Sequence, residues 1–143
     1  MLKSENIKSE EKNKKSLRRF ESRLKQGFLR VIMLHLIKQG KASNGYQLMA
    51  EIKRHTDNKW TPGPNRIYPI LQEFEKHGWI VVRDNPGYRK DGKSKKRQRK
   101  LIKMTDKGNI AADERIRATR DILLPWQHLI SSMDDKEKQK HPS

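Results

Sequence analysis

The sequence predicts an α+β fold that is mostly α-helical, and three features of its 143 residues indicate this fold class. Apolar residues recur at helical spacing in three successive segments that end before residue 78. Two short β-rich segments follow, separated by a loop rich in lysine and arginine. The last third of the chain repeats its apolar residues in heptads, which predicts an added C-terminal helix.

The first predicted helix is apolar on most of its sides. Residues 27–39 read GFLRVIMLHLIKQ, and Gly40 is a typical helix stop. Leu17, Phe20 and Leu24 recur at helical spacing and extend this helix back to about Ser16. Residues 1–15 contain few apolar side chains, so we expect them to form a flexible basic arm. The nine Lys and Arg of residues 1–26, against four Glu, either hold a polyanion or only keep the chain soluble.

Two further helices follow, each with its own start signal. Ser43 or Asn44 is the expected N-cap of a short helix through residue 55. In the stretch GPNRIYPILQEFEKHGWI, Gly63 and Pro64 suit the N-cap and first helical position, and a glycine ends the helix. Pro69 is less expected, because it removes one helical hydrogen bond. The predicted core face of this third helix comprises Ile67, Ile70, Leu71 and Phe74.

The segment after the third helix predicts a β-hairpin with a basic loop. Residues 79–83 and 101–104 are the two strand candidates. Residues 83–103 hold ten Lys and Arg against two Asp. Three helices followed by a strand, a basic loop and a strand are the order of a winged helix-turn-helix, whose third helix enters the major groove of DNA.

The predicted DNA-binding residues fall into two groups. On the third helix, opposite the core face, we expect Asn65, Arg66, Tyr68 and Gln72 to meet the major groove, with Asn65 and Arg66 the best candidates for base contacts. On the wing, we expect phosphate or minor-groove contacts from Tyr88, Arg89, Lys90, Lys93, Lys95, Lys96 and Arg97. Each single residue of either group is also compatible with an ordinary solvated position.

Five short motifs lie between about Gly27 and Gly108. They are Gly45-Tyr46-Gln47-Leu48, Trp60-Thr61-Pro62-Gly63-Pro64, Ile67-Tyr68-Pro69-Ile70-Leu71, Phe74-Glu75 followed by Gly78, and Thr105-Asp106-Lys107-Gly108. With these motifs the chain resembles the PadR-type transcriptional regulators over this range. The resemblance implies tolerance of a proline within the recognition helix and dimerisation through a C-terminal helix, often with the N-terminal helix packed alongside. Asn65 and Arg66 stand where the family often has Gly and then Thr or Ser, and Leu101 and Ile102 stand where it usually has Tyr.

The C-terminal segment carries the heptad pattern. Thr105 is the expected N-cap, and residues 105–133 are the expected dimerisation region. The predicted seam comprises Ala112, Ile116, Thr119, Leu123, Trp126, Ile130 and Met133; it would meet a partner helix or pack back on its own domain. Pro125 should kink this helix or divide it, and residues 134–143 are expected to be disordered. The winged-helix domain itself is expected over residues 16–104.

Composition argues against an enzyme. The chain has no cysteine, its five histidines lack metal-ligand spacing, and no glycine-rich phosphate loop follows a strand, so we expect no cofactor, no metal and no catalysis. It contains no apolar run long enough to cross a membrane, and we expect a cytoplasmic protein without a membrane partner. The formal charge of +17 favours a polyanionic partner.

These features predict a homodimeric, sequence-specific regulator of transcription that binds double-stranded DNA. Two-fold symmetry implies a pseudo-palindromic promoter site, and repression by occupancy is the expected mode. The alternative is an architectural protein that coats or bends DNA with little sequence preference, which the high charge favours. Some PadR-type regulators bind phenolic or drug-like compounds near the dimer interface, so the resemblance implies a possible effector of unknown identity. The charged C-terminal helix argues against an apolar effector pocket, although Trp126 could line one.

Overall fold

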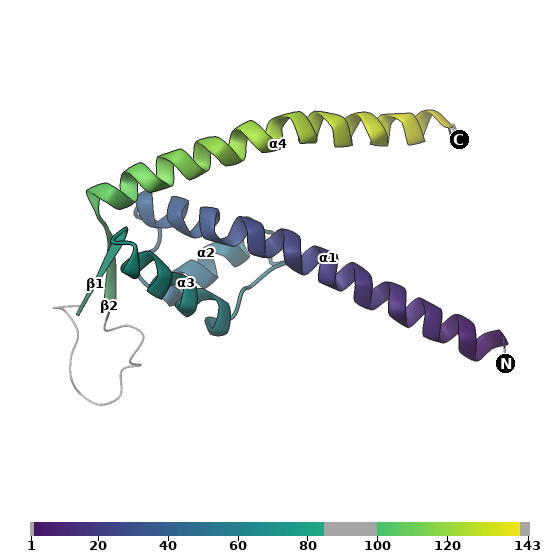
Figure 1. The fold of residues 1–143 in the computed structure, drawn as a ribbon, viewed down its shortest axis with the longest axis horizontal. Helices are drawn as coiled ribbons and strands as arrows, with labels where there is room; N and C mark the ends of the chain where they lie inside the picture. The colour runs from purple at the N-terminus through teal and green to yellow at the C-terminus, as the bar shows by residue number, and fades with distance from the viewer. Residues whose placement is uncertain (1, 85–99, 141–143) are drawn as a thin grey trace.

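The structure, a computed structural model, describes residues 2–84 and 100–140 and has the predicted mostly helical α+β architecture (Figure 1). Its elements, in chain order, are α1 (Leu2–Lys38), α2 (Gly45–His55), α3 (Pro64–Lys76), β1 (Ile80–Asp84), β2 (Lys100–Met104) and α4 (Asp106–Lys140). Helices α1, α2 and α3 pack together beside the two-stranded sheet, and α4 lies against α1. This arrangement confirms the winged helix-turn-helix.

Helix α1 begins at Leu2, about four turns earlier than predicted, and runs for 37 residues. The prediction of a helix start near Ser16 was therefore wrong, and residues 2–15 are helical. The physical reason is visible in the sequence, because Glu10 and Glu11 each precede a lysine by four residues, the orientation that stabilises an exposed helix. The first proline or glycine of the chain, Gly27, comes well inside the helix.

Helices α2 and α3 begin where the sequence predicted. The Asn44 side chain accepts a 2.8 Å hydrogen bond from the Gln47 amide, which makes Asn44 the N-cap of α2. Gly63 caps α3, Pro64 is its first helical residue, and Pro69 lies inside the helix. Gly78 follows α3 with a φ of 74°, a left-handed conformation that glycine adopts more readily than other residues do.

Strands β1 and β2 pair antiparallel, with Val82 opposite Ile102. Ile80 and Ile102 are buried against the helices, while Val81, Arg83, Lys100 and Lys103 are exposed. The Ile102 amide donates a 2.7 Å hydrogen bond to the Ser43 carbonyl, so the sheet is anchored to the turn before α2. The base of the wing is therefore held in a fixed relation to the helix-turn-helix.

The core is one cluster shared by all the elements. Its members include Leu29, Met33 and Leu34 of α1, Leu48 and Ile52 of α2, Ile67, Ile70, Leu71 and Phe74 of α3, and Ala112 of α4. All four predicted core residues of α3 are buried, which leaves the polar side of that helix to face outward.

Helix α4 is continuous through Lys140. Thr105 caps it as predicted, since its hydroxyl oxygen accepts a 3.0 Å hydrogen bond from the Gly108 amide. Pro125 does not divide the helix, and Figure 1 shows α4 curving instead. The prediction of disorder from residue 134 was wrong for residues 134–140, which extend the helix.

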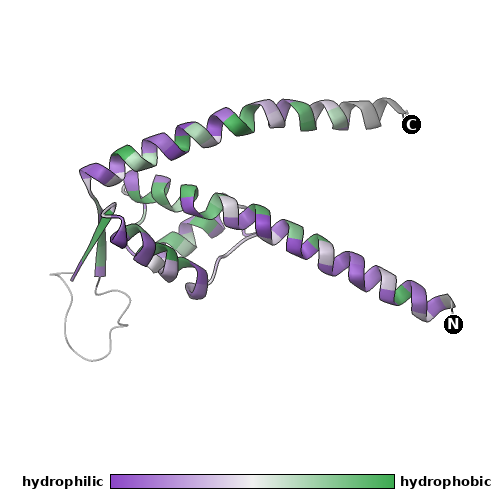
Figure 2. Ribbon diagram, in the orientation of Figure 1, coloured by the Kyte–Doolittle hydropathy of each residue, from purple (hydrophilic) through white to green (hydrophobic). Residues whose placement is uncertain are grey.

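The ends of α1 and α4 project from the body of the molecule on the same side and diverge as they leave it, with both termini at that side (Figure 1). Most of the α1 projection is hydrophilic, with separate apolar turns (Figure 2). These two projecting helices leave long surfaces without a partner within the described part of the chain.

Candidate nucleic-acid interface

The outward side of α3 carries three of the four side chains predicted to meet the major groove. Asn65, Arg66 and Gln72 are all exposed, and no acidic residue lies in the first turn of the helix. Asn65 and Arg66 occupy that first turn, where the helix dipole favours an anion, although the Arg66 amide itself donates to the Gly63 carbonyl at 3.0 Å. The outward side of α3 therefore suits contact with a polyanion.

Tyr68 differs from its three neighbours. Its hydroxyl is buried, and its ring packs on the core and lies so close to Gly45 that a Cβ atom there would come within 2.9 Å of the ring. The ring of Tyr68 therefore fixes α3 on the first turn of α2. A DNA contact by Tyr68 stays a prediction.

The guanidinium of Arg66 turns toward α1. Its Nη2 lies 3.5 Å from the hydroxyl of Ser22, at the outer limit of a hydrogen bond. Around this contact lies a cleft of about 330 Å³ between α1 and the start of α3, lined by Arg18, Glu21, Ser22, Lys25, Arg66 and residues 60–63. The ammonium of Lys25 lies 5.8 Å from the centroid of the Trp60 ring. Sequence reasoning did not place α1 beside the recognition helix.

A second hollow lies between α3 and the hairpin. It has a volume of about 600 Å³, and its lining includes Gln72 and Glu75 of α3, Asp84 of β1 and Lys100 of β2. Gln72 thus lies where the outward side of α3 meets the base of the wing. The predicted wing residues Tyr88, Arg89, Lys90, Lys93, Lys95, Lys96 and Arg97 lie outside the described residues.

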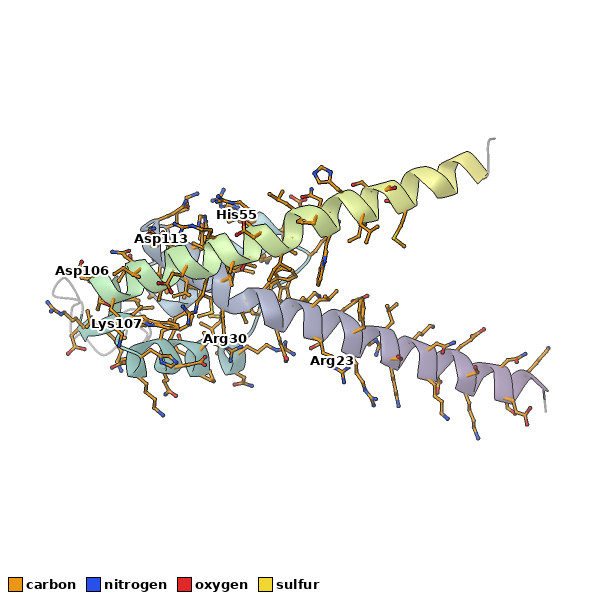
Figure 3. The ribbon with its side chains drawn as sticks, turned by 45° about the horizontal axis from the view of Figure 1, so that its top comes forward. Arg23, Arg30, His55, Asp106, Lys107 and Asp113 are labelled. Carbon is orange, nitrogen blue, oxygen red and sulfur yellow. The ribbon has the colours of Figure 1, made fainter. Side chains whose placement is uncertain are left out.

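Ion pairs fix α3 and α4 on α1. Arg30 donates to the Glu73 carboxylate at 2.9 Å, joining α1 to α3, and Lys38 pairs with Asp113 of α4. Figure 3 shows Arg30 between α1 and α3. On α2, the hydrogen bond that Arg54 donates to Glu51 lowers the pKa of the Glu51 carboxyl. All three ion pairs are at least partly solvated, so each adds little to the stability of the chain.

The predicted seam of α4 divides into two parts. Ala112 is fully buried in the core of its own chain, so the prediction of a dimer contact was wrong for this residue. Ile116 is partly buried against the same core, and its contact with a partner stays a prediction. Thr119 and Leu123 line a groove of about 440 Å³ that α1 and α2 complete. Trp126, Ile130 and Met133 are 59–60% exposed. A heptad spacing is the same whether the helix packs on a partner or on α1 of its own chain, so the sequence pattern predicted one continuous seam.

The chain is similar to known proteins in both sequence and fold. The sequence profile of the transcriptional regulator PadR-like family matches residues 33–114, more than half of the chain. The chain belongs to the PadR-like family. The matched region extends from α1 through the recognition helix and the hairpin into α4.

The chain also resembles individual PadR-like and related proteins. It is 33% identical over 64 residues to the transcriptional regulator YqjI of Escherichia coli (strain K12), a match that covers 45% of this chain and only 30% of that relative. Among solved structures, it resembles the PadR-like transcriptional regulator of Bacillus cereus strain ATCC 14579 (TM-score 0.59, 22% identity, covering 76% of this chain and 96% of that one). A putative transcriptional regulator of Thermoplasma acidophilum has the same TM-score and coverage at 18% identity. At these identities the solved structures show the shared fold.

Other kinds of site find no support among the residues that the structure describes. Within residues 2–84 and 100–140, no group of three His, Cys, Asp or Glu side chains is placed to hold a metal ion. In the same two ranges, every helix is too short or too polar to cross a bilayer.

Proposed function

We propose that this PadR-family chain is a homodimeric, sequence-specific repressor that binds a pseudo-palindromic promoter site in double-stranded DNA. The observation that carries the proposal is the outward side of α3, which combines Asn65, Arg66 and Gln72 with a cation-rich hairpin beside it. Asn and Gln can pair with adenine and Arg with guanine in the major groove. The protein acts by occupancy of its site and carries out no reaction.

The proposed dimer rests on the exposed apolar surface of the two projecting helices. On α4, Ile122, Trp126, Leu129, Ile130 and Met133 are all more than half exposed, and they follow one another at steps of four, three, one and three residues. On α1, Leu17, Phe20 and Leu24 are exposed at helical spacing. Apolar stripes of this kind are typical of helices that pack on a partner. A second copy of the chain would cover both stripes and pair two recognition helices.

The experiment that tests this function is selection of bound duplexes from a random pool, followed by affinity measurements at physiological salt. A specific regulator holds its selected sequence at least about a thousandfold more tightly than scrambled DNA. Equal affinities that fall steeply with salt would contradict the proposal and favour the architectural alternative, to which the charge of +17 is equally suited.

A further inference from the structure

The side of α1 that faces α3 carries a basic stripe on its projecting part. At 3.6 residues per turn, Lys8, Lys15, Arg18, Arg19 and Lys25 all lie within about 60° of Ser22 around the helix. The same arc contains one acidic residue, Glu11. Leu17, Phe20 and Leu24 lie on the opposite side of α1. The apolar stripe is therefore free to pack on a partner helix while the basic stripe faces elsewhere.

The basic stripe adjoins the recognition helix. Ser22 lies within reach of Arg66 in the first turn of α3, and Arg18 and Lys25 line the cleft that separates the two helices. Glu21 is the single acidic side chain in the lining of that cleft, against three cations. Figure 3 shows nitrogen-tipped side chains along the edge of α1 nearer to α3.

A duplex that receives α3 in its major groove must carry a phosphate strand past the first turn of that helix. The major groove is about 12 Å wide, and its two borders are the phosphate backbones. The strand at the N-terminal end of α3 would therefore run toward the cleft and the basic stripe beyond it. Lys15 and Lys8 lie about 10 and 20 Å from Ser22 along α1, which extends the stripe over several phosphates.

We propose that the projecting half of α1 is a second phosphate-binding element, which follows the DNA backbone that flanks the site read by α3. This inference rests on the proposed function, because it needs α3 on the same duplex. It gives the two sides of the α1 projection separate roles, with Leu17, Phe20 and Leu24 facing protein and the basic stripe facing DNA.

The test compares two double variants that remove the same charge from the same helix. Lys8→Ala/Lys15→Ala takes two lysines from the basic stripe, while the control Lys3→Ala/Lys14→Ala takes two lysines that lie about 80–100° from Ser22 around α1, outside the arc of the stripe. All four side chains are exposed. Helical content by circular dichroism and mass by sedimentation confirm that both variants fold and assemble as the parent chain does.

The readout is the dependence of log affinity on log salt, on the selected duplex and on scrambled DNA. Loss of two phosphate contacts lowers the magnitude of the slope by about two units in the Lys8/Lys15 variant, on both duplexes. The fold-loss of affinity relative to the parent chain is therefore about ten times larger at 50 mM than at 200 mM salt. The Lys3/Lys14 control keeps the parent slope.

Equal loss of slope in the two double variants would overturn the inference, since α1 would then act only through net charge. Unchanged slopes in both would overturn it as well. A parent chain that prefers no sequence but shows the stripe-specific loss would instead refute the proposed specificity and leave the phosphate contact standing. A parent chain that binds no duplex would refute both.

Discussion

At the scale of single residues, the start of α4 shows why a glycine occupies position 108. The Thr105 hydroxyl donates a 2.6 Å hydrogen bond to the carbonyl of Gly78, which follows α3, and it accepts one from the Gly108 amide. This tight junction brings Gly108 so close to Trp79 that a Cβ atom would lie 2.0 Å from the Trp79 carbonyl oxygen. The backbone of Trp79 cannot move aside without disturbing β1.

Gly108→Ala is therefore expected to destabilise the chain by about 3 kcal/mol, the cost of forcing an extra carbon into a packed junction. The matched control is Gly27→Ala, because a Cβ at this position within α1 meets no atom within 4 Å. That substitution should stabilise the chain by about 0.5–1 kcal/mol through helix propensity. Urea unfolding measures both, and equal stabilities of the two variants would contradict the predicted crowding.

A single substitution of Arg66 tests whether α3 reads DNA bases. Replacement by Ala should lower affinity for the selected duplex by about 1–3 kcal/mol if Arg66 pairs with a guanine, and should relax specificity at that base pair. The control is Lys76→Ala, which removes an exposed cation from the other end of α3. Binding titrations on selected and scrambled DNA separate the outcomes, and equal weakening on the two duplexes would place Arg66 on phosphate instead of a base.

At the scale of elements, the exposed half of the α4 seam is the part expected to form the dimer. Trp126→Ala/Ile130→Ala should convert the dimer to monomer without unfolding it, because both side chains are about 60% exposed in the single chain. His128→Ala on the opposite side of α4 is the control. Sedimentation velocity reports the mass, and a dimer that persists in the double variant would contradict the proposed interface.

The elements also show how far the sequence predicts the fold. The caps at Asn44, Gly63 and Thr105 and the core face of α3 act over a few residues, so local patterns were sufficient to predict them. The length of α1 depends on Glu–Lys pairs along an exposed helix, which a search for apolar spacing misses. The burial of Ala112 depends on where α1 and α4 meet, and no local pattern contains that information.

The candidate site was predictable in part for the same reason. Asn65, Arg66 and Gln72 follow directly from the phase of α3, because its opposite side is buried. The packing of Tyr68 on Gly45 and the contact between Ser22 and Arg66 join helices that are distant in sequence. These tertiary contacts give Tyr68 a packing role, which the phase of α3 does not reveal, and bring α1 to the edge of the proposed DNA surface.

At the scale of the whole molecule, α1 and α4 project apolar stripes from a compact winged helix, and α3 lies on the body of that domain (Figures 1 and 2). A two-fold axis that passes between the projecting helices of two chains would relate their two α3 recognition helices by symmetry. Such a pair reads two inverted half-sites whose centres lie about one DNA turn, or a multiple of it, apart. The symmetry of the bound DNA therefore reports on the dimer and on the recognition helix together.

The most direct measurement of the central claim is the symmetry and spacing of the sequences selected from random duplexes. The account predicts an inverted repeat with half-site centres about 10 base pairs, or a multiple of that, apart. Sequences without a dyad, or without any shared motif, would contradict a dimer that reads DNA through α3.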